Sequence, residues 1–361
     1  MQPLAMHIKL PAYEIPCYFG ENLWESLLRY LQVHFPDFAL FVISDSHVAE
    51  LYKGVVQEKL GAHSGFRGVL TFPAGEANKS RRQKEKLEDA LLAQKAGRDT
   101  VIVAMGGGVT GDLAGYVAAT LLRGVPLVHL PTSLLAQVDS SIGGKTGVNH
   151  PAGKNLIGAF YQPQAIFCDV NFIDTLPDDE FSSGMGEVIK YAVTLDDELW
   201  QWLEKKRQAI LDREHRTLQK VIERCARLKI GIAESDEKEA GLRSILNFGH
   251  TVGHAIEQLS KYRLKHGFAV AAGMFVAAKL SERYLNYPKE RVERLENLLQ
   301  SYHLNHVDFS AFTINEIWES MLSDKKTRQQ IPRFSLMNAS NQPELFYPIE
   351  KRELENVLGS I

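Results

Sequence analysis

Histidines and one glutamate supply the side chains of this sequence that are best suited to catalysis. His250 and His254 are four residues apart, so on a helix both point the same way, one turn apart. A third imidazole follows at His266, and Glu187 lies upstream in a stretch with helical character. Two imidazoles and one carboxylate are a common ligand set for a catalytic zinc, which keeps one position for water or substrate. Glu187, His250 and His266 are therefore the predicted metal ligands.

A purely structural role is the alternative for each of these side chains. A lone histidine near an apolar helix is usually a hydrogen-bonded core or surface residue, and His266 taken alone would be assigned to that class. The paired histidines favour a metal site. Each follows a glycine, a residue of low helix propensity, and a glycine beside a helical histidine indicates that another part of the chain approaches closely there. No glutamate separates the two histidines as in HExxH metalloproteases, so the general base of peptide hydrolysis is missing.

A glycine-rich turn follows the apolar run Val101–Met105. Residues Gly106–Asp112 have GxGxxG spacing, and a strand, a turn and a helix N-terminus together can hold a diphosphate. No acidic residue follows about 20 positions later, as the common dinucleotide fingerprint requires, so a tight turn without ligand is the alternative. Two other strand ends could complete a dinucleotide site: Asp45, placed to accept from ribose hydroxyls, and Ala74–Lys79.

Lysines in a glycine-rich region form a predicted anion pocket. Between Pro131 and Gly147 the charged residues are Asp139 and Lys145, and Lys154 follows after another glycine. Lysines held in glycine-rich loops, without acidic neighbours in sequence, suit a phosphate or a carboxylate. Surface lysines on flexible loops are the alternative.

Four further cations lie on or beside apolar segments: Arg123, Lys190, Lys229 and Arg243. Each one alone is most simply a solvated helix charge. Lys190 differs, because it lies one helical turn after Glu187 and would share its face.

Composition excludes several classes of protein. Against 44 acidic residues there are 41 Lys and Arg, a net charge of −3, so nothing global argues for nucleic-acid binding. The three cysteines, Cys17, Cys168 and Cys225, are far apart and form no disulfide framework or CxxC site, which fits a reducing compartment. No secretory signal is visible, and no apolar run approaches the roughly 18 to 20 residues of a membrane span. We expect a soluble, cytoplasmic protein.

Apolar runs alternate with helical patterns in the first half of the chain. This alternation predicts right-handed βαβ units and a mostly parallel, Rossmann-like sheet. Strands are expected at 38–43, 68–72, 100–105, 127–130 and 165–169, and helices at 46–60, 79–95 and from the glycine turn through Leu122.

Helical periodicity dominates after Leu176-Pro177. The sequence therefore predicts two domains, an α/β domain over residues 1–176 and a mainly α-helical domain over 177–361. Helices are expected at 198–211, 216–232, 250–259, 269–285, 289–302 and 314–322, and strands at 333–337 and 345–347.

Four long motifs give the chain a strong family resemblance. They are GGGVTGDLAGYVAATLLRG, PTSLLAQVDSSIGGKTGVNHPAGKNLIGAFYQP, GEVIKYA and LRSILNFGHTVGHAIE. From about Asp45 to Leu336 the chain resembles the 3-dehydroquinate synthases, enzymes of the shikimate pathway. The resemblance implies a homodimeric lyase that uses NAD and a zinc or cobalt ion. It also implies a small sugar-phosphate substrate, 3-deoxy-D-arabino-heptulosonate 7-phosphate, which cyclises to 3-dehydroquinate and phosphate through oxidation, elimination, reduction and aldol closure.

Site residues follow from matching positions of the family's motifs. The metal would be held by Glu187, His250 and His266. Substrate-binding and catalytic residues would be Arg123, Asp139, Lys145, Asn155, Lys190, Lys229, Arg243, Asn247 and His254, and either Lys325 or Lys326 would join them. With the strand-end residues named above, the predicted cofactor-binding set is Asp45, Gly75, Glu76, Lys79, Gly106, Gly107, Gly108, Val109, Thr110, Gly111, Asp112, Thr132, Ser133, Lys145, Lys154, Phe172, Ile173, Asp174 and Thr175.

Two positions depart from the family pattern. Phe268 stands where the family generally has glutamate, so metal affinity or histidine orientation could differ here if that carboxylate supports a ligand. Ser133 stands where threonine is common, which keeps the hydroxyl.

Three rival functions remain open on sequence alone. The first is another sugar-phosphate cyclase, such as a 2-deoxy-scyllo-inosose synthase. The second is a metal- and NAD-dependent alcohol dehydrogenase. The third, motivated by Phe268, is a homologue that binds NAD as a sensor.

Overall fold

The chain forms two units, which are described separately. This computed structural model describes all residues except 1–2, 12, 238–240, 305–306, 323–330 and 361. One unit is Met1–Leu176 together with Leu218–Glu234, and the other is Pro177–Thr217 together with Ser235–Ile361. The expected boundary after Leu176 coincides with the end of the first unit's main segment. The segment Leu218–Glu234, expected in the helical domain, instead belongs to the first unit.

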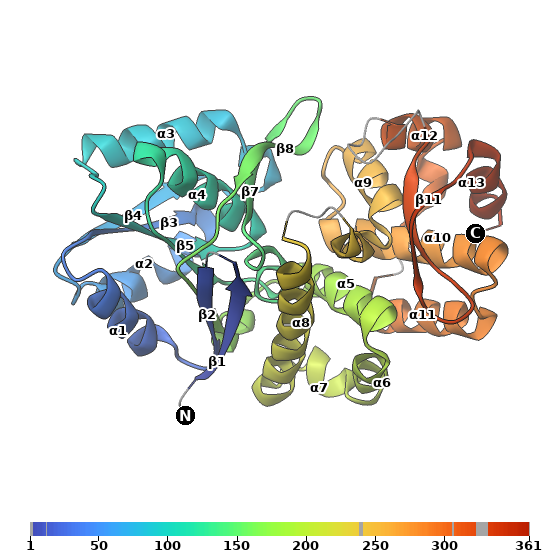
Figure 1. The fold of residues 1–361 in the computed structure, drawn as a ribbon, viewed down its shortest axis with the longest axis horizontal. Coiled ribbons are helices and arrows are strands. Elements are labelled where there is room, and N and C mark those ends of the chain that lie inside the picture. The colour runs from blue at the N-terminus through green and yellow to red at the C-terminus, as the bar shows by residue number, and fades with distance from the viewer. Residues whose placement is uncertain (1–2, 12, 238–240, 305–306, 323–330, 361) are drawn as a thin grey trace. The chain divides into compact units, whose positions relative to one another are not determined.

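A seven-stranded sheet organises the first unit (Figure 1). Its strand order is β1-β2-β9-β6-β5-β3-β4, and among the pairings only β1 with β2 is antiparallel. The prediction of a mostly parallel sheet is therefore confirmed. The strands are β1 Leu4–Leu10, β2 Tyr13–Gly20, β3 Ala39–Asp45, β4 Phe66–Phe72, β5 Thr100–Gly106, β6 Leu127–Pro131 and β9 Ala165–Asp169.

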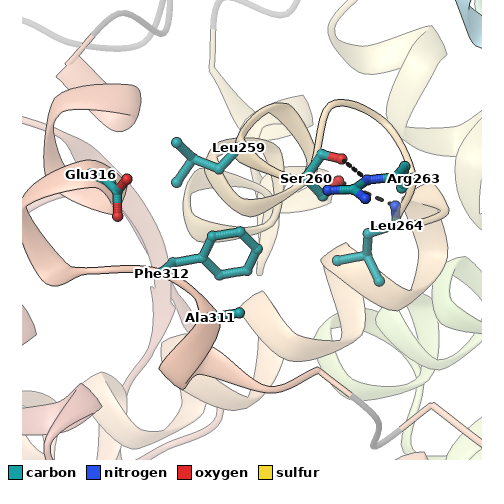
Figure 2. A pocket seen from close by; sticks show the side chains of 7 residues that line it. All are labelled: Leu259, Ser260, Arg263, Leu264, Ala311, Phe312 and Glu316. Atoms are coloured by element: carbon teal, nitrogen blue, oxygen red, sulfur yellow. Dashed lines mark hydrogen bonds between the residues drawn. The ribbon is translucent and has the colours of Figure 1, made fainter.

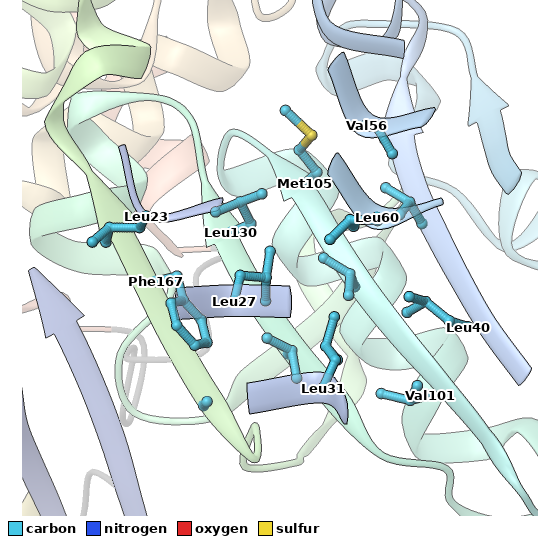
Figure 3. Packing of buried hydrophobic residues seen from close by; sticks show 14 of the residues in the cluster. Leu23, Leu27, Leu31, Leu40, Val56, Leu60, Val101, Met105, Leu130 and Phe167 are labelled. Atoms are coloured by element: carbon cyan, nitrogen blue, oxygen red, sulfur yellow. The ribbon is translucent and has the colours of Figure 1, made fainter. Parts of the chain in front are cut away.

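Helices cover both faces of this sheet, so the central strands are apolar on both sides. Leu40 and Val42 of β3 face one hydrophobic cluster with α1 and α2 (Figure 3), whereas Phe41 and Ile43 face a second cluster with α3 and α4. The helices of this unit are α1 Trp24–His34, α2 Ser46–Leu60, α3 Arg81–Ala93, α4 Gly108–Thr120 and most of α8 His215–Ser235, with short turns η1 Glu76–Asn78, η2 Leu121–Arg123, η3 Ala136–Ser140 and η4 Val170–Thr175.

A separate antiparallel hairpin holds the lysine-rich motif. It pairs β7 Lys145–His150 with β8 Gly153–Phe160. The expectation that Lys145 and Lys154 lie in glycine-rich loops is thus wrong. Gly147 and Gly158 face each other across this hairpin, and a Cβ on Gly158 would lie 2.0 Å from the Thr146 carbonyl oxygen. The glycines therefore permit close pairing of the two strands rather than forming loops.

The second unit is mainly helical, as predicted. Helix α10 is its centre and packs against α5, α9, α11, α13 and β10. Its elements are α5 Asp178–Leu195, α6 Asp197–Lys205, α7 Arg207–Leu211, η5 Leu242–Asn247, α9 His250–Leu259, α10 His266–Leu285, α11 Lys289–Ser301, η6 Phe309–Ala311, α12 Ile314–Leu322, β10 Arg333–Met337, β11 Pro343–Pro348 and α13 Lys351–Leu358.

Most predicted element boundaries agree with the structure to within a few residues, and three differ. The helix expected at 198–211 is two helices, α6 and α7, which meet at Lys206. Helix α4 ends at Thr120 rather than Leu122, and Leu122 then has a left-handed backbone with φ of 52°. Helix α10 begins at His266, three residues before its apolar periodicity. Among the helices of the described residues, none combines the length and apolar character that a membrane span requires.

Candidate active site

The three predicted metal ligands converge within the second unit. Glu187 lies in the buried middle of α5, His250 is the first residue of α9, and His266 is the first residue of α10. Their ligand atoms all lie within 4.8 Å of one another. Oε1 of Glu187 lies 3.3 Å from Nε2 of His250 and 3.3 Å from Nε2 of His266. Residues far apart in sequence thus form one cluster.

The spacing of these atoms fits a tetrahedral metal site. Bonds of roughly 2.0 to 2.1 Å, as zinc makes to oxygen and nitrogen, separate two ligands of a tetrahedron by roughly 3.3 to 3.4 Å. Oε1 of Glu187 is buried and has no hydrogen-bond partner among the described residues. A buried carboxylate oxygen without a donor is costly unless a cation occupies the space it faces. The residues present therefore fit a bound divalent metal.

Both imidazoles are oriented for ligation through Nε2. Nδ1 of His250 lies 3.3 Å from the carbonyl oxygen of Phe248, and Nδ1 of His266 lies 3.3 Å from Oε2 of Glu257. An acceptor at Nδ1 favours the tautomer with its proton there, and this leaves the Nε2 lone pair for a metal.

Glycines allow the helices that carry these ligands to approach closely. A Cβ on Gly267 would lie 1.8 Å from the carbonyl oxygen of Ser183 in α5. Gly249, which precedes α9, has φ of +81°, and its Cβ would lie 2.6 Å from the backbone nitrogen of Met274. The histidine–glycine pairs in the sequence therefore set backbone contacts that bring the ligand-bearing helix ends together.

Lys190 controls the electrostatics of the cluster. It lies one turn after Glu187 on α5, and its ammonium donates to Oε2 of Glu187. Only 2% of Lys190 and 1% of Glu187 are exposed. Burial opposes charge on Glu187, but Lys190 and His250 outweigh it and hold the pKa of this carboxyl well below its usual range. The carboxylate is therefore charged and fixed, with one oxygen bound to Lys190 and the other facing the histidines.

The two histidines titrate in opposite directions without a metal. Burial lowers the pKa of His250 to about 3, although Glu187 opposes this shift. Burial also disfavours charge on His266, but Glu257 and Glu187 outweigh it and raise its pKa to about 9.

Two further acid–base groups lie beside the triad. His254 is one turn along α9, and its ring centroid lies 5.2 Å from that of His250 and 5.9 Å from that of His266. Glu257 is buried on the same helix and was missed by the sequence reasoning. A signal was present, because residues 250, 254 and 257 have the i, i+4, i+7 spacing of a single helix face.

Arg243 and Asn247 lie on η5 of the same unit. Arg243 is 2% exposed, its backbone N–H donates to Asp236, and its Nη1 donates to the carbonyl oxygen of Glu237 at 2.6 Å. The assignment as a solvated helix charge is therefore wrong for Arg243 and for Lys229, which are both buried. Lys190, which the sequence set apart from that assignment, is buried as well. Arg123, by contrast, is exposed. Lys325 and Lys326 lie outside the described residues.

A surface cavity of the second unit lies apart from these side chains. It has a volume of about 530 Å³ and is lined by residues at the C-terminal end of α9 and by η6 and α12, including Leu259, Arg263, Phe312 and Glu316 (Figure 2). None of the predicted site residues lines it.

Two neighbouring parallel strands of the first unit, β3 and β5, end at the predicted nucleotide loop. The chain runs from β3 outward to β4 and then returns to β5 on the other side of β3, so the strand order reverses between β3 and β5. Ligands of open α/β sheets bind at such a reversal, beyond the carboxyl ends of the strands. Asp45 ends β3, Gly106 ends β5, and α4 begins at Gly108.

Small polar side chains surround this loop. Thr110 donates to Oδ2 of Asp45 at 3.1 Å, while Oδ1 of Asp45 accepts from the first turn of α2. A Cβ on Gly107 would lie 3.3 Å from Oγ of Ser133, so larger side chains would fill the space above the turn. Thr132 hydrogen-bonds through its backbone to Gly106 at 3.0 Å. Gly106 to Asp112, Thr132 and Ser133 therefore lie close together, as a phosphate-binding turn requires.

Predicted cofactor and substrate residues also meet in a polar cluster of the same unit. The buried Lys79 contacts Asp112 and donates to Oδ1 of Asn155 at 2.6 Å. The pKa of Asp112 is raised, because the effect of burial outweighs the opposing effect of Lys79. Glu76 is linked to Lys154 at 3.5 Å. Gly75, with φ of +102°, begins the turn that carries Glu76.

Asn149 connects these residues and was not predicted. Its amide donates to Oε1 of Glu76 at 2.7 Å, and its Oδ1 accepts from the backbone of Asn155 at 3.1 Å. It lies within the motif that carries Lys145 and Lys154, but nothing in its spacing separated it from its neighbours.

Two of the predicted substrate-binding residues pair with each other between η3 and α8. Nζ of Lys229 lies 2.8 Å from Oδ1 of Asp139 and donates to the Asp139 carbonyl oxygen at 2.6 Å. The segment Phe172–Thr175 lies in η4, where Phe172 and Ile173 are buried in the core while Asp174 and Thr175 are exposed. Phe172 belongs to the hydrophobic cluster that contains Leu40 and Val42.

Comparisons with known proteins agree with this arrangement. Residues 69–183 match the family described as 3-dehydroquinate synthase N-terminal, and residues 184–327 match 3-dehydroquinate synthase C-terminal. The 3-dehydroquinate synthase of Geobacter metallireducens is 45% identical over 88% of this chain and 87% of its own length. That of Desulforamulus reducens is 41% identical over 95% and 96%.

Solved structures show the same architecture. A 2-deoxy-scyllo-inosose synthase, complexed with carbaglucose-6-phosphate, NAD+ and Co2+, is 28% identical and superposes with a TM-score of 0.88 over 98% of this chain and 99% of its own. The 2-epi-5-epi-valiolone synthase ValA of Streptomyces hygroscopicus, with NAD+ and Zn2+ bound, shares the fold at 24% identity, with a TM-score of 0.88 over 98% of each chain. On the sequence matches to both its halves, this chain belongs to the 3-dehydroquinate synthase family.

Proposed function

We propose that this chain is a 3-dehydroquinate synthase, a lyase of the shikimate pathway that supplies aromatic amino-acid biosynthesis. It converts 3-deoxy-D-arabino-heptulosonate 7-phosphate to 3-dehydroquinate and phosphate. The observation that carries this proposal is the convergence of Glu187, His250 and His266 in a chain 41% to 46% identical to curated 3-dehydroquinate synthases.

NAD and a zinc or cobalt ion are the proposed cofactors. The cyclase of similar architecture holds NAD+ and Co2+, and the ValA structure holds NAD+ and Zn2+. In this chain the glycine turn at the β3/β5 reversal suits the diphosphate of NAD, and the tetrahedral spacing at Glu187 suits the metal. Asp45, with its oxygens at the end of β3, is the proposed partner of a ribose hydroxyl.

The chain's own side chains bind and orient the substrate. NAD held at the glycine turn would supply a hydride acceptor, and a metal held by Glu187, His250 and His266 would supply a Lewis acid. Arg243, fixed by Asp236 and Glu237, is the proposed partner of the substrate carboxylate, because a guanidinium binds a carboxylate with two parallel N–H groups. Lys145, Lys154 and Lys190 are the proposed phosphate and hydroxyl donors, acting as point charges.

Few side chains of the proposed site are suited to carry protons. His254 is the proposed proton carrier, since it lies beside both metal-facing imidazoles, and Asn247 is proposed to orient a hydroxyl. Oxidation of the substrate hydroxyl gives a ketone, which makes the neighbouring C–H acidic. The leaving phosphate can itself accept that proton, so the protein need not supply a strong base.

Another sugar-phosphate cyclase is the alternative that an observation favours. The 2-deoxy-scyllo-inosose synthase structure resembles this chain along nearly its whole length. The higher identity to 3-dehydroquinate synthases, and a buried guanidinium suited to a carboxylate-bearing substrate, favour the main proposal.

Phosphate release is the direct test. The purified chain is incubated with NAD, cobalt and either the heptulosonate phosphate or glucose 6-phosphate, with and without a chelator. We expect phosphate from the heptulosonate phosphate only, without accumulation of NADH, and loss of activity with chelator. His250→Ala should bind no metal, whereas His34→Ala, an exposed histidine of α1, should behave as wild type. Turnover of glucose 6-phosphate would favour the alternative cyclase, and NADH accumulation would favour a dehydrogenase.

We also propose that the enzyme is a cytoplasmic homodimer. The cysteines support the compartment, because Cys17, Cys168 and Cys225 are all buried free thiols. Light scattering of the purified chain tests the dimer, and a monomeric mass at assay concentration would refute it.

A further inference from the structure

A buried carboxylate lies behind one metal-facing histidine. Glu257 is 3% exposed, and its Oε2 lies 3.3 Å from Nδ1 of His266, the ring nitrogen opposite the one that faces Glu187. A carboxylate is rarely buried unless its charge is paired, so its position calls for a partner of this kind. The two carboxylates thus contact the two nitrogens of one imidazole.

Helix geometry explains how the carboxylate reaches this position. Residues 250, 254 and 257 share one face of α9, and His266 begins α10, which packs against α9. His250 has a backbone carbonyl at its own Nδ1. His266 is the first residue of its helix, and its Nδ1 acceptor is a side chain from another helix. The orientation of the His266 ring therefore depends on a side chain, that of Glu257, which a substitution can remove.

We propose that Glu257 is the positioning residue of the metal site. Its carboxylate accepts a hydrogen bond from Nδ1–H of His266 and so directs Nε2 toward the metal, an inference that rests on the proposed function of the Glu187, His250 and His266 cluster. Such supporting carboxylates fix the tautomer and the ring orientation of a ligand and raise its basicity.

This assignment also bears on Phe268. The residue lies two positions after His266 on α10, and side chains two apart on a helix do not face each other. A glutamate at 268 would therefore not replace Glu257 at Nδ1. The carboxylate that supports His266 in this chain comes from α9, and Phe268 leaves that support intact.

Cobalt titration of the metal-free protein tests the proposal. Glu257→Gln keeps the shape of the side chain and removes its charge, and Glu257→Ala removes the acceptor. We expect one cobalt ion per chain in each case, with the dissociation constant raised about 10- to 100-fold, more in Glu257→Ala, and an altered visible spectrum of the bound cobalt. Phe268→Glu is the matched control, and its affinity should stay within about threefold of wild type, alone or combined with Glu257→Gln.

The outcomes separate the proposals from each other. Wild type that binds no cobalt would refute the metal site and with it the proposed function. Wild type that binds cobalt while Glu257→Gln binds equally tightly with an unchanged spectrum would refute only the positioning role. Two cobalt ions in wild type and one in Glu257→Ala would make Glu257 a ligand of a second site with His254 and His266, which also overturns it. Thermal melting of the metal-free variants shows whether a loss of affinity is merely a loss of folding.

Discussion

The buried pair of Glu187 and Lys190 gives a quantitative prediction for the metal-free protein. The two residues are 1% and 2% exposed and are one turn apart on α5. Removing one partner of a buried pair costs about 3 to 5 kcal/mol, because the remaining charge has no compensation. Glu187→Gln should therefore lower the free energy of unfolding by that amount. Replacing both partners by neutral groups should cost less, so adding Lys190→Met to Glu187→Gln should recover at least about 2 kcal/mol.

The chain provides a matched control with the same spacing. Lys279 and Glu282 form an ion pair three residues apart on α10, at 3.4 Å, with 29% and 28% of their side chains exposed. Because solvent reaches both side chains, this pair contributes less than about 1 kcal/mol, so Glu282→Gln should change stability by no more than that.

Urea unfolding in a chelator buffer, followed by tryptophan fluorescence, measures these differences. Three of the four tryptophans, Trp200, Trp202 and Trp318, lie in the second unit with the pair. The reasoning is refuted if Glu187→Gln costs no more than Glu282→Gln. It is also refuted if the double variant is no more stable than Glu187→Gln alone, since the buried ammonium would then not be the source of the cost.

Three other predictions follow from packing, burial and hydrogen bonding. Gly267→Ala should destabilise the second unit by more than about 2 kcal/mol and abolish cobalt binding, because its Cβ would lie 1.8 Å from the Ser183 carbonyl oxygen. Gly231→Ala is the control: this glycine lies on the exposed face of α8 with open space around it, so the change should stabilise the protein by up to about 1 kcal/mol. If both variants change the free energy of unfolding in urea by similar amounts, the packing argument is contradicted. Burial lowers the pKa of His129 in β6 from an ordinary value of 6.5 to about 4, so between these pH values the unfolded chain binds more protons than the folded one and stability falls as pH decreases. Between pH 7.5 and 5, in chelator, wild type should therefore lose about 2 kcal/mol more stability than His129→Gln. Equal losses would show that His129 is not the source of this pH dependence. Arg243→Lys should weaken substrate binding by about 1 to 3 kcal/mol through loss of the two-pronged guanidinium, and unchanged kcat and KM would count against that role.

Long periodic segments of this fold could be predicted from sequence. Helix α2 and helix α9 begin and end where the pattern placed them, and the buried strands β3, β5 and β6 lie within a residue or two of expectation. These elements bury a continuous apolar face, so their period is visible in the residues themselves. The hairpin of β7 and β8 has no such face. Its strands carry glycines and exposed residues such as Leu156 and Phe160, so the same segment reads as loops.

The candidate site was predictable in its residue types but not in its connections. Glu187, His250 and His266 could be named because carboxylates and imidazoles are the ligands a metal needs, and the family motifs aligned with them. The contact of Glu257 with His266 depends on how α9 crosses α10, which is set by backbone approach at Gly249 and Gly253. Such three-dimensional contacts leave little trace in a single sequence. The same holds for Asn149, which lies in β7 and bonds to Glu76 of η1 and to Asn155 of β8, because the sequence did not reveal this hairpin.

The return of α8 to the first unit has a consequence for protein synthesis. Residues Leu218–Glu234 join the sheet-containing unit after the chain has left it, and Lys229 and Glu234 bond to Asp139 and to the backbone of Lys9. A nascent chain that has emerged only as far as Leu176 therefore lacks the helix α8 that completes its first folding unit. Vectorial folding on the ribosome cannot finish that unit until Glu234 leaves the exit tunnel, by which time the first helices of the second unit are already outside.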